Sequence, residues 1–290
     1  MDETIRIGII GGSGLYEMEA LTDITELEIA TPFGPPSDTI ITGKIEGVPV
    51  AFLPRHGRGH RLTPTPVPYR ANIWALKSLG VERILSVSAC GSLREDLHPG
   101  EIVIPDQLVD FTRRRESSFF GAGLVGHISA AEPFCPQSSA LLAEALEAEG
   151  GIVHRGGTFI TIEGPRFSTK AESHLFRSWG ISIIGMTTSP EAFLAREAGL
   201  CYAVMAHITD YDVWHESEAA VTVEMVIRRL QANLDLAQRA IVRLVPKLAS
   251  TPRTCDCAHA LDVAMITDPA RIPPKQAEWL RFLRGQPRRD

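Results

Sequence analysis

Short apolar segments alternate with longer amphipathic ones along most of the 290 residues, and this order constrains the fold more than any other feature. The short segments are rich in Ile and Val and are bounded by Gly, Pro or charged residues, which is typical of buried strands. Strands are predicted over residues 5–10, 40–44, 48–53, 84–87, 102–104, 159–162, 181–184 and 202–208. Apolar residues at intervals of three and four predict helices over residues 69–79, 138–149, 169–179, 190–198 and 221–248. This order predicts an α/β fold in which helices cover both faces of one sheet.

The predicted strands and helices indicate one domain over residues 1–250, without internal repeats. Pro, Thr and Arg become more frequent after Ser250, so residues 251–290 are expected to form an extended C-terminal arm. A short helix is predicted near the end of this arm, over residues 276–283. The arm is expected to pack on the same domain or on a neighbouring subunit.

Charge and hydropathy exclude several classes of partner. The formal net charge is −6 and the chain has no long basic run, so nucleic acid is not expected as a partner. The triplet Arg113-Arg114-Arg115 is expected to be a solvated turn or a subunit contact. No apolar run approaches the ~20 residues that cross a bilayer, so no membrane partner is expected. The acidic start lacks the basic and apolar regions of a secretory signal, which favours a cytoplasmic location.

The chain contains five cysteines, and an odd number argues against a secreted disulfide framework. The sequence Cys255-Asp256-Cys257 has three interpretations: a redox pair, part of a metal site together with His259, or two thiols on a mobile tail. Cys90 follows an apolar strand and is expected to be a small buried residue.

Four loops that follow predicted strands carry residues suited to binding an anion. Glycines let backbone N–H groups approach a phosphate, hydroxyls donate to its oxygens, and an arginine offers a two-pronged charged donor. The loops are Gly11-Gly12-Ser13-Gly14, Pro54-Arg55-His56-Gly57, Ser88-Ala89-Cys90-Gly91-Ser92 and Gly185-Met186-Thr187-Thr188. Each loop alone is weak evidence, since a tight strand-to-helix turn needs the same residues. Their shared place at strand ends predicts one anion-binding crevice.

A fifth loop, Thr209-Asp210-Tyr211-Asp212, follows the last predicted strand. Two carboxylates two residues apart project to a similar side if the chain stays extended. A solvated acidic turn or a helix cap would use the same residues. The pair therefore predicts a functional acid only in combination with the other loops.

Taken together, these motifs resemble the trimeric purine nucleoside phosphorylases, over about residues 6–248. Two further motifs are closest to the members of that family that cleave 5′-methylthioadenosine: Ala131-Glu132-Pro133-Phe134-Cys135 and Thr209-Asp210-Tyr211-Asp212-Val213-Trp214. The family motifs are the first three anion loops, residues 71–77 and Ile162-Glu163-Gly164-Pro165-Arg166-Phe167-Ser168.

The resemblance implies a single-domain fold with a central mixed β-sheet flanked by helices, and a homotrimer with active sites at subunit interfaces. It implies no metal and no cofactor, with inorganic phosphate as a co-substrate. Phe167 would pack on the purine and Met186 against the ribose, and His127 of a neighbouring subunit, Val223 and Val226 would surround the 5′ substituent. The implied phosphate ligands are Ser13, Arg55, His56, Ser88, Ala89 and Thr187.

The resemblance also bears on the cysteines. Cys255 and Cys257 are similar to a Cys-x-Cys pattern of some hyperthermophile members, which form intrachain disulfides and assemble as hexamers, or dimers of trimers. Cys135 and Cys201 would be a second candidate bridge. Trimer and hexamer both stay open.

Cleavage of an N-glycosidic bond builds positive charge on the ribose, which phosphate stabilises, and negative charge on the purine. Asp210 is the expected acid at N7, with a pKa raised by burial and by Asp212, and Asp212 is expected to orient Asp210 and the 6-amino group. Relatives that use 6-oxopurines typically have Asn in place of Asp210 and Glu in place of Ser168, so a 6-aminopurine is expected. The valines suit a methylthio group. The expected substrate is 5′-methylthioadenosine, and the expected products are adenine and 5-methylthioribose 1-phosphate.

Several alternatives stay open at this point. The nearest is a phosphorylase for methylthioinosine or 6-oxopurine nucleosides. A nucleosidase would use water in place of phosphate. A nicotinamide-dependent oxidoreductase would explain the glycine-rich start but not the other four loops, and a non-catalytic nucleoside-binding protein would have little use for the Arg-His-hydroxyl set.

Overall fold

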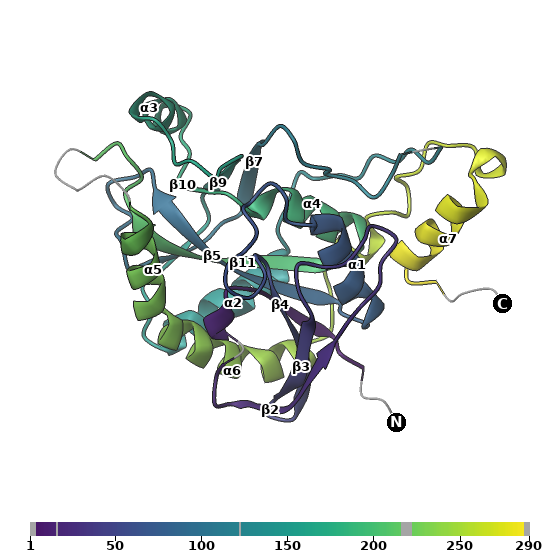
Figure 1. The fold of residues 1–290 in the computed structure, drawn as a ribbon, viewed down its shortest axis with the longest axis horizontal. Helices are drawn as coiled ribbons and strands as arrows, with labels where there is room; N and C mark the ends of the chain where they lie inside the picture. Colours follow the sequence, from purple (N-terminus) through teal and green to yellow (C-terminus); the bar gives the residue numbers. More distant parts are fainter. Residues whose placement is uncertain (1–3, 16, 122, 216–221, 287–290) are drawn as a thin grey trace.

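The computed structural model describes residues 4–15, 17–121, 123–215 and 222–286 (Figure 1). Eleven strands form one mixed sheet, which confirms the predicted α/β class and central mixed sheet. The strands are β1 (Ile7–Gly11), β2 (Leu21–Leu27), β3 (Ile40–Ile45), β4 (Val48–Pro54), β5 (Arg83–Ser92), β6 (Ile102–Ile104), β7 (Gln107–Phe111), β8 (Val153–Arg155), β9 (Thr158–Ile162), β10 (Ile183–Gly185) and β11 (Cys201–Asp210).

Helices cover both faces of the sheet (Figure 1). On one face, α2 (Pro136–Ala148) and α6 (Leu234–Ser250) enclose an apolar core against β1, β3, β4 and β11. On the other face, α1 (Tyr69–Ser78) and α4 (Thr188–Glu197) pack against each other, and α4 packs against β5 and β11. Two further helices are α3 (Lys170–Ser178) and α5 (Val223–Ala232), and the short 3-10 turns are η1 (Ser13–Leu15), η2 (Asp256–His259) and η3 (Pro269–Arg271).

Strand β5 lies at the centre of the sheet and has three neighbours. β11 runs parallel to it along one edge, from Arg83 to Gly91. β1 and β10 share the opposite edge: β1 pairs as far as Ser86, and antiparallel β10 begins only at Gly91. Among the described residues, no strand pairs with residues 87–90 on this edge, because β1 has ended and β10 has not begun.

Most predicted elements are present, but the prediction missed β2, β7 and β8. β2 is an edge strand with the sequence LTDITEL, in which polar residues break up the apolar run. The helix predicted over residues 221–248 is two helices, α5 and α6, which meet at Asn233. Asn is a poor helix former, so a break there is favourable. Val221, the predicted start, lies outside the described residues.

The C-terminal arm ends in α7 (Pro274–Leu283), which begins two residues before the predicted helix. In Figure 1 this yellow helix lies at the right-hand end of the molecule, opposite α5. Trp279 and Phe282 pack on Trp74 of α1, with ring centroids 6.0 and 4.2 Å apart. The arm is thus held by aromatic contacts with the body of its own chain. None of the described helices combines the length and the apolar composition that a membrane span requires.

Candidate active site

Four predicted loops meet at one edge of the sheet because the strands before them run in parallel. β1 pairs with β4 up to Gly11 and Pro54, and the Arg55 backbone N–H donates to the Gly11 carbonyl at 3.1 Å. β1 also pairs with β5, and β5 pairs with β11. The glycine-rich turn, Arg55, the Ser88 segment and Asp210 therefore lie in one region, at the carboxyl ends of these strands. This convergence is predicted from the sequence.

Arg55 is buried and forms a two-pronged ion pair with Glu191, the carboxylate in the first turn of α4. Nε and Nη2 donate to the two carboxylate oxygens at 2.8 and 2.9 Å. Nη2 also donates to Ser86 Oγ at 2.6 Å, and Nη1 donates to the Val87 carbonyl at 3.1 Å. Burial lowers the pKa of Arg55, but the Glu191 charge outweighs it and the net pKa is raised. Arg55 is therefore a fixed cation, and described residues engage four of its five N–H groups.

Glu191 is not predicted from sequence; it is fully buried and also accepts a hydrogen bond from Tyr202 at 2.6 Å. Its partner Arg55 is 136 residues away in the chain, so only the fold brings the pair together. The Val87 carbonyl that accepts from Arg55 lies on the stretch of β5 that lacks a second strand. Arg55 thus occupies the gap between β1 and β10.

His56 follows Arg55 and is partly buried. Its Nδ1 lies 2.8 Å from the Leu62 carbonyl, which can only accept, so Nδ1 carries the proton. Its ring stacks on His60 with centroids 4.3 Å apart. Burial and the Arg55 charge lower the pKa of His56 to about 4, so the ring is neutral at pH 7 and Nε2 is a hydrogen-bond acceptor.

The other predicted phosphate ligands lie around the gap beside β5. Ser88 is buried on β5. Because β10 runs antiparallel to β5 with Ile184 opposite Gly91, the residues after β10 run along the same edge toward Ala89. A Cβ on Gly185 would lie 3.4 Å from the Ala89 carbonyl, and buried Thr187 follows two residues later. The backbone of Ser13 lies in η1 directly after β1, but its side chain lies outside the described part of the structure.

Asp210 is the last residue of β11, not a loop residue, and a bulge before it shifts the register against β5. Its Oδ2 accepts from Thr209 Oγ1 at 2.7 Å, and its Oδ1 accepts from the Asp212 backbone N–H at 2.8 Å. Burial raises the pKa of Asp210 to about 6, and the Asp212 charge acts in the same direction. These are the two causes that the sequence analysis expected.

Asp212 is buried beside Asp210, and its backbone has a left-handed conformation (φ 51°). Burial raises its pKa, and the nearby hydroxyls of Ser173 and Ser168 oppose this. Neither hydroxyl meets hydrogen-bond geometry, so Asp212 Oδ2 and both Oγ atoms have no hydrogen-bond partner among the described residues. Three buried polar atoms without partners favour a polar ligand at this point.

Arg115 corrects the prediction that residues 113–115 form a solvated turn or subunit contact. Arg113 and Arg114 are exposed, but the Arg115 side chain is 1% exposed. Its Nη1 donates to the carbonyls of Met186 and Ser189 at 2.6 and 2.7 Å, and its Nη2 donates to the Glu163 carbonyl at 2.7 Å. Arg115 therefore ties the loop after β9, which carries half-buried Phe167, to the loop after β10, which carries Met186.

The residues expected at the 5′ end do not meet within one chain. His127 is exposed, and its backbone N–H donates to Ala264 of the arm at 2.8 Å. Val223 is 61% exposed on α5, at the opposite end of the molecule from the arm (Figure 1). The side chain of Val226 lies outside the described part of the structure. This separation agrees with a His127 supplied by a neighbouring subunit, which stays a prediction.

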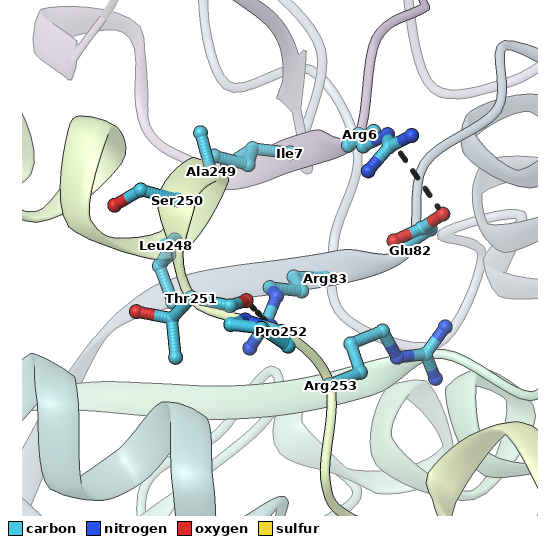
Figure 2. A pocket seen from close by; sticks show the side chains of 10 residues that line it. All are labelled: Arg6, Ile7, Glu82, Arg83, Leu248, Ala249, Ser250, Thr251, Pro252 and Arg253. Carbon is cyan, nitrogen blue, oxygen red and sulfur yellow. Dashed lines mark hydrogen bonds and ion pairs between the residues drawn. The ribbon is translucent and has the colours of Figure 1, made fainter.

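A pocket also opens at the amino-terminal ends of β1 and β5, away from these loops (Figure 2). Its charged lining consists of Arg6, Glu82, Arg83 and Arg253. Arg83 Nη2 donates to the Thr251 carbonyl at 2.6 Å, so this arginine holds the start of the arm. The pocket contains none of the predicted site residues, and its position is opposite to the strand ends where ligands of α/β sheets bind.

Comparisons with known proteins agree with this geometry. The family model for the phosphorylase superfamily matches residues 6–246. The S-methyl-5′-thioadenosine phosphorylase of Geobacter sulfurreducens is 54% identical over 280 residues, which cover 96% of this chain and 98% of the relative.

Two solved structures extend the comparison. A methylthioadenosine phosphorylase from an Antarctic soil metagenomic library superposes with a TM-score of 0.93 at 48% identity, covering 97% of this chain and 99% of that one. A variant of the adenosine/methylthioadenosine phosphorylase from Schistosoma mansoni, in complex with methylthioadenosine, gives a TM-score of 0.81 at 38% identity, covering 86% and 93%. The chain belongs to the phosphorylase superfamily, and within it the chain is similar to the methylthioadenosine phosphorylases.

Proposed function

We propose that this enzyme, a pentosyltransferase of the phosphorylase superfamily, cleaves 5′-methylthioadenosine with inorganic phosphate to give adenine and 5-methylthioribose 1-phosphate. The observation that carries the proposal is the buried Asp210–Asp212 pair at the carboxyl end of β11, beside Gly91 of β5. The names of the relatives support the same substrate.

Phosphate binds in the gap beside β5. Ser13, Ser88 and Thr187 donate from their hydroxyls, and Ala89 contributes through its backbone. Arg55 supplies the positive charge, and its pair with Glu191 fixes where that charge lies. His56 is neutral, so its Nε2 lone pair accepts a hydrogen bond from the P–OH group of a phosphate monoanion or dianion. Anionic phosphate so held stabilises the positive charge that develops at C1′ and then attacks it.

Asp210 is the general acid for the departing adenine. With a pKa of about 6, roughly one in ten of these side chains is protonated at pH 7 before substrate binds. The purine displaces water from the site and favours the neutral acid further. The protonated carboxyl donates to N7 as negative charge builds on the base, so the base leaves as neutral adenine.

Asp212 and Ser168 set the preference for a 6-amino group. Asp212 Oδ2, which lacks a hydrogen-bond partner, accepts from the adenine amine, while a 6-oxo group would place an oxygen against a carboxylate oxygen. A substrate that leaves a buried polar group of the site unpaired is disfavoured strongly, by ~10⁴-fold, relative to one that pairs it. Phe167 packs on the purine and Met186 against the ribose.

The 5′ pocket assembles only between chains in this proposal. His127 of a neighbouring subunit, Val223 and Val226 enclose the methylthio group, and the enzyme is a homotrimer or a hexamer in the cytoplasm. It serves purine and methionine salvage through adenine and the sugar phosphate.

Adenine release from 5′-methylthioadenosine, measured with and without inorganic phosphate, tests the reaction. We expect release to depend strictly on phosphate and 5-methylthioribose 1-phosphate to accumulate in equal amount. Release without phosphate would instead establish a nucleosidase. Methylthioinosine is the matched second substrate, and faster cleavage of it would overturn the assignment of Asp212 and Ser168.

A further inference from the structure

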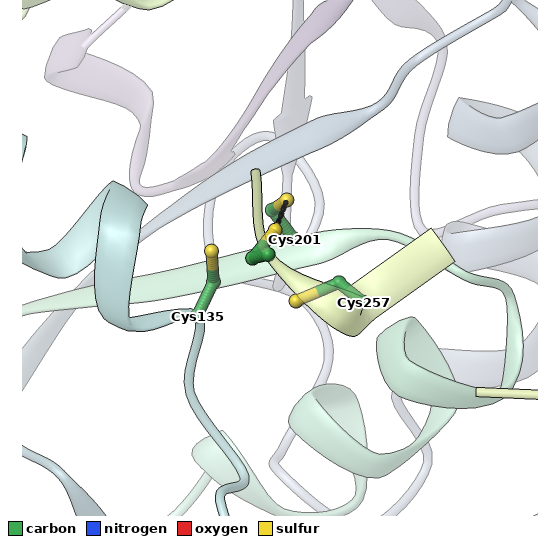
Figure 3. Close-up of side chains that lie close together, drawn as sticks. Cys135, Cys201 and Cys257 are labelled. Carbon is green, nitrogen blue, oxygen red and sulfur yellow. Dashed lines mark hydrogen bonds between the residues drawn. The ribbon is translucent and has the colours of Figure 1, made fainter. Parts of the chain in front are cut away.

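Four of the five cysteines converge at one place, although they are far apart in the sequence. Cys135 precedes α2, Cys201 begins β11, and Cys255 and Cys257 lie at η2 in the arm. All four Sγ atoms lie within 4.8 Å of one another, and Figure 3 shows Cys135, Cys201 and Cys257 directed toward a common point. Cys135, Cys201 and Cys257 are buried, and Cys255 is half-buried.

The spacing of the sulfurs suits a tetrahedral ion. With a Zn–S distance of about 2.3 Å, the edges of a ZnS₄ tetrahedron are about 3.8 Å long. The Sγ atoms of Cys201 and Cys255 lie 3.4 Å apart, and no pair exceeds 4.8 Å. All five cysteines of the chain are free thiols in the structure. His259, the ligand considered from sequence, is exposed and pairs with Asp262 instead.

The surroundings favour thiolates. The backbone N–H of Ser138, in the first turn of α2, donates to Cys135 Sγ at 3.4 Å, and Arg196 Nη1 donates to Cys257 Sγ at 3.2 Å. Arg253 lies close enough to Cys201, Cys255 and Cys257 for its charge to interact with theirs. Zn²⁺ with four thiolates carries two surplus negative charges, which Arg196 and Arg253 offset.

We propose that Cys135, Cys201, Cys255 and Cys257 form a structural site for one thiophilic divalent cation, with Zn²⁺ as the fitting ion. Four protein ligands complete the coordination, so no position is left for a water or a substrate. Binding forms four metal–sulfur bonds and releases the four thiol protons to solvent, without any oxidation or reduction. The resemblance implies no metal, and the proposed site departs from it at the start of β11, at the other end of that strand from Asp210.

The cation would clamp the arm to the body of the chain. η2 would be joined to the start of β11 and to the N-terminus of α2, while α7 packs on Trp74 of α1 and on Phe33. Met265, a few residues after η2, pairs with Gly126 as an isolated bridge, and Ala264 accepts from the His127 backbone. The clamp therefore also fixes the segment that carries His127.

The test is the metal content of the full chain, purified under anaerobic, reducing conditions and measured by inductively coupled plasma mass spectrometry. We expect about one zinc per chain, replaceable by Co²⁺ with the visible d–d absorption of tetrahedral sulfur coordination. The double variant Cys255→Ser/Cys257→Ser should lose the metal and melt several degrees lower. Cys90→Ser, a buried cysteine outside the cluster, is the matched control and should keep full metal content.

If the double variant fails to fold, thiol titration of the wild-type chain with a mercurial gives the same answer, since zinc should be released as the sulfurs react. Three results would overturn the proposal: no bound Zn²⁺ or Co²⁺ in reduced protein, unchanged metal content in the double variant, or zinc release that does not follow thiol modification. The chain can also be reduced, supplied with metal and weighed by mass spectrometry. A mass that still lacks the four thiol hydrogens lost in two disulfides would establish disulfide bridges in place of the cation.

Discussion

Two buried acidic groups lie near the carboxyl ends of the central strands, and they differ in their partners. Glu191 is fully buried, but both of its oxygens accept from the Arg55 guanidinium, and Tyr202 and Ser86 add further hydrogen bonds. Asp210 is buried beside Asp212, another acid, and among the described residues it accepts only from Thr209 and the Asp212 backbone N–H. Both groups have lost water, but of the two only Glu191 forms an ion pair within the described part of the chain, while the Arg229 charge acts on Asp210 without cancelling the effect of burial.

The partner decides what a buried carboxyl can do. A carboxylate paired with a guanidinium stays ionised and holds structure, and removal of one partner leaves the other charge buried. A carboxyl without a cation keeps its proton to a higher pH, as the pKa of about 6 for Asp210 shows. Glu191 therefore contributes to the stability of the fold and Asp210 to the chemistry, and substitutions at the two positions should separate these effects.

Asp210→Asn should have the largest effect, and it should act in opposite directions on activity and stability. Loss of the general acid should lower kcat on 5′-methylthioadenosine by ~10²–10⁴ and shift preference toward 6-oxopurine nucleosides. Because the pKa of Asp210 is higher in the folded state than in the unfolded state, its ionisation lowers the free energy of unfolding. This loss grows as the pH rises from about 4 through about 6. The variant should therefore melt higher than wild type at pH 7 but not at pH 4, as calorimetry can show. Unchanged kinetics would remove Asp210 from the mechanism.

Glu191→Gln should instead destabilise the fold by about 3–5 kcal/mol, because it leaves the Arg55 charge buried without its counterion. Urea unfolding at pH 7 measures this. Glu197→Gln is the matched control, because Glu197 is buried on the same helix but, within the described part of the chain, accepts hydrogen bonds only from Ser118 and the Phe119 backbone. Its pKa is raised by burial to about 7, so that substitution should cost far less. Equal losses in the two variants would contradict the comparison.

Gly91→Ala tests how closely Asp210 is positioned. A Cβ at this position would lie 2.8 Å from Asp210 Oδ1 and 3.2 Å from the Asp212 backbone nitrogen, so the carboxyl must move. A displacement of about 1 Å can cost 10²-fold, and we expect a loss of that order in kcat/KM for the nucleoside. The thermal midpoint should change little by comparison. A variant with wild-type kinetics would show that the position of Asp210 is not critical.

Thr209→Val should have the smallest effect and should appear in the pH profile. The Thr209 hydroxyl stabilises ionised Asp210 and lowers its pKa, so its removal should raise that pKa by about one unit. The protonated form is active, so log kcat/KM falls as pH rises through the pKa. This falling limb should move to higher pH in Thr209→Val and return in Thr209→Ser. A profile that does not move would show that another group titrates there.

The sequence predicted the carboxylates and the anion loops because Gly, Ser and Asp residues directly follow Ile- and Val-rich strands. It could not predict the direction of β10 or the gap beside β5, since strand pairing depends on contacts between distant segments. Arg115 was interpreted as a surface residue because its charge alone favours solvent, and its carbonyl partners lie about 50 to 75 residues away.

The arm shows the same limit. Its terminal helix was predictable from the local sequence, but the resemblance to the family suggests Cys135 with Cys201, and Cys255 with Cys257, only as two separate pairs. The structure places all four in one cluster, because β11 starts where the arm returns to the body.

Strand β5 lies between the anion loops and the strand that carries Asp210, so it takes part in binding both phosphate and nucleoside. One edge of β5 is open to the anion loops and its other edge carries the strand with Asp210, and only four residues lie between Ser86 and Gly91 to separate the two pairings. A rigid backbone of that length transmits any shift at one ligand to the other. Nucleoside and oxyanion should therefore bind with a measurable coupling free energy, each tightening the other's affinity by the same factor.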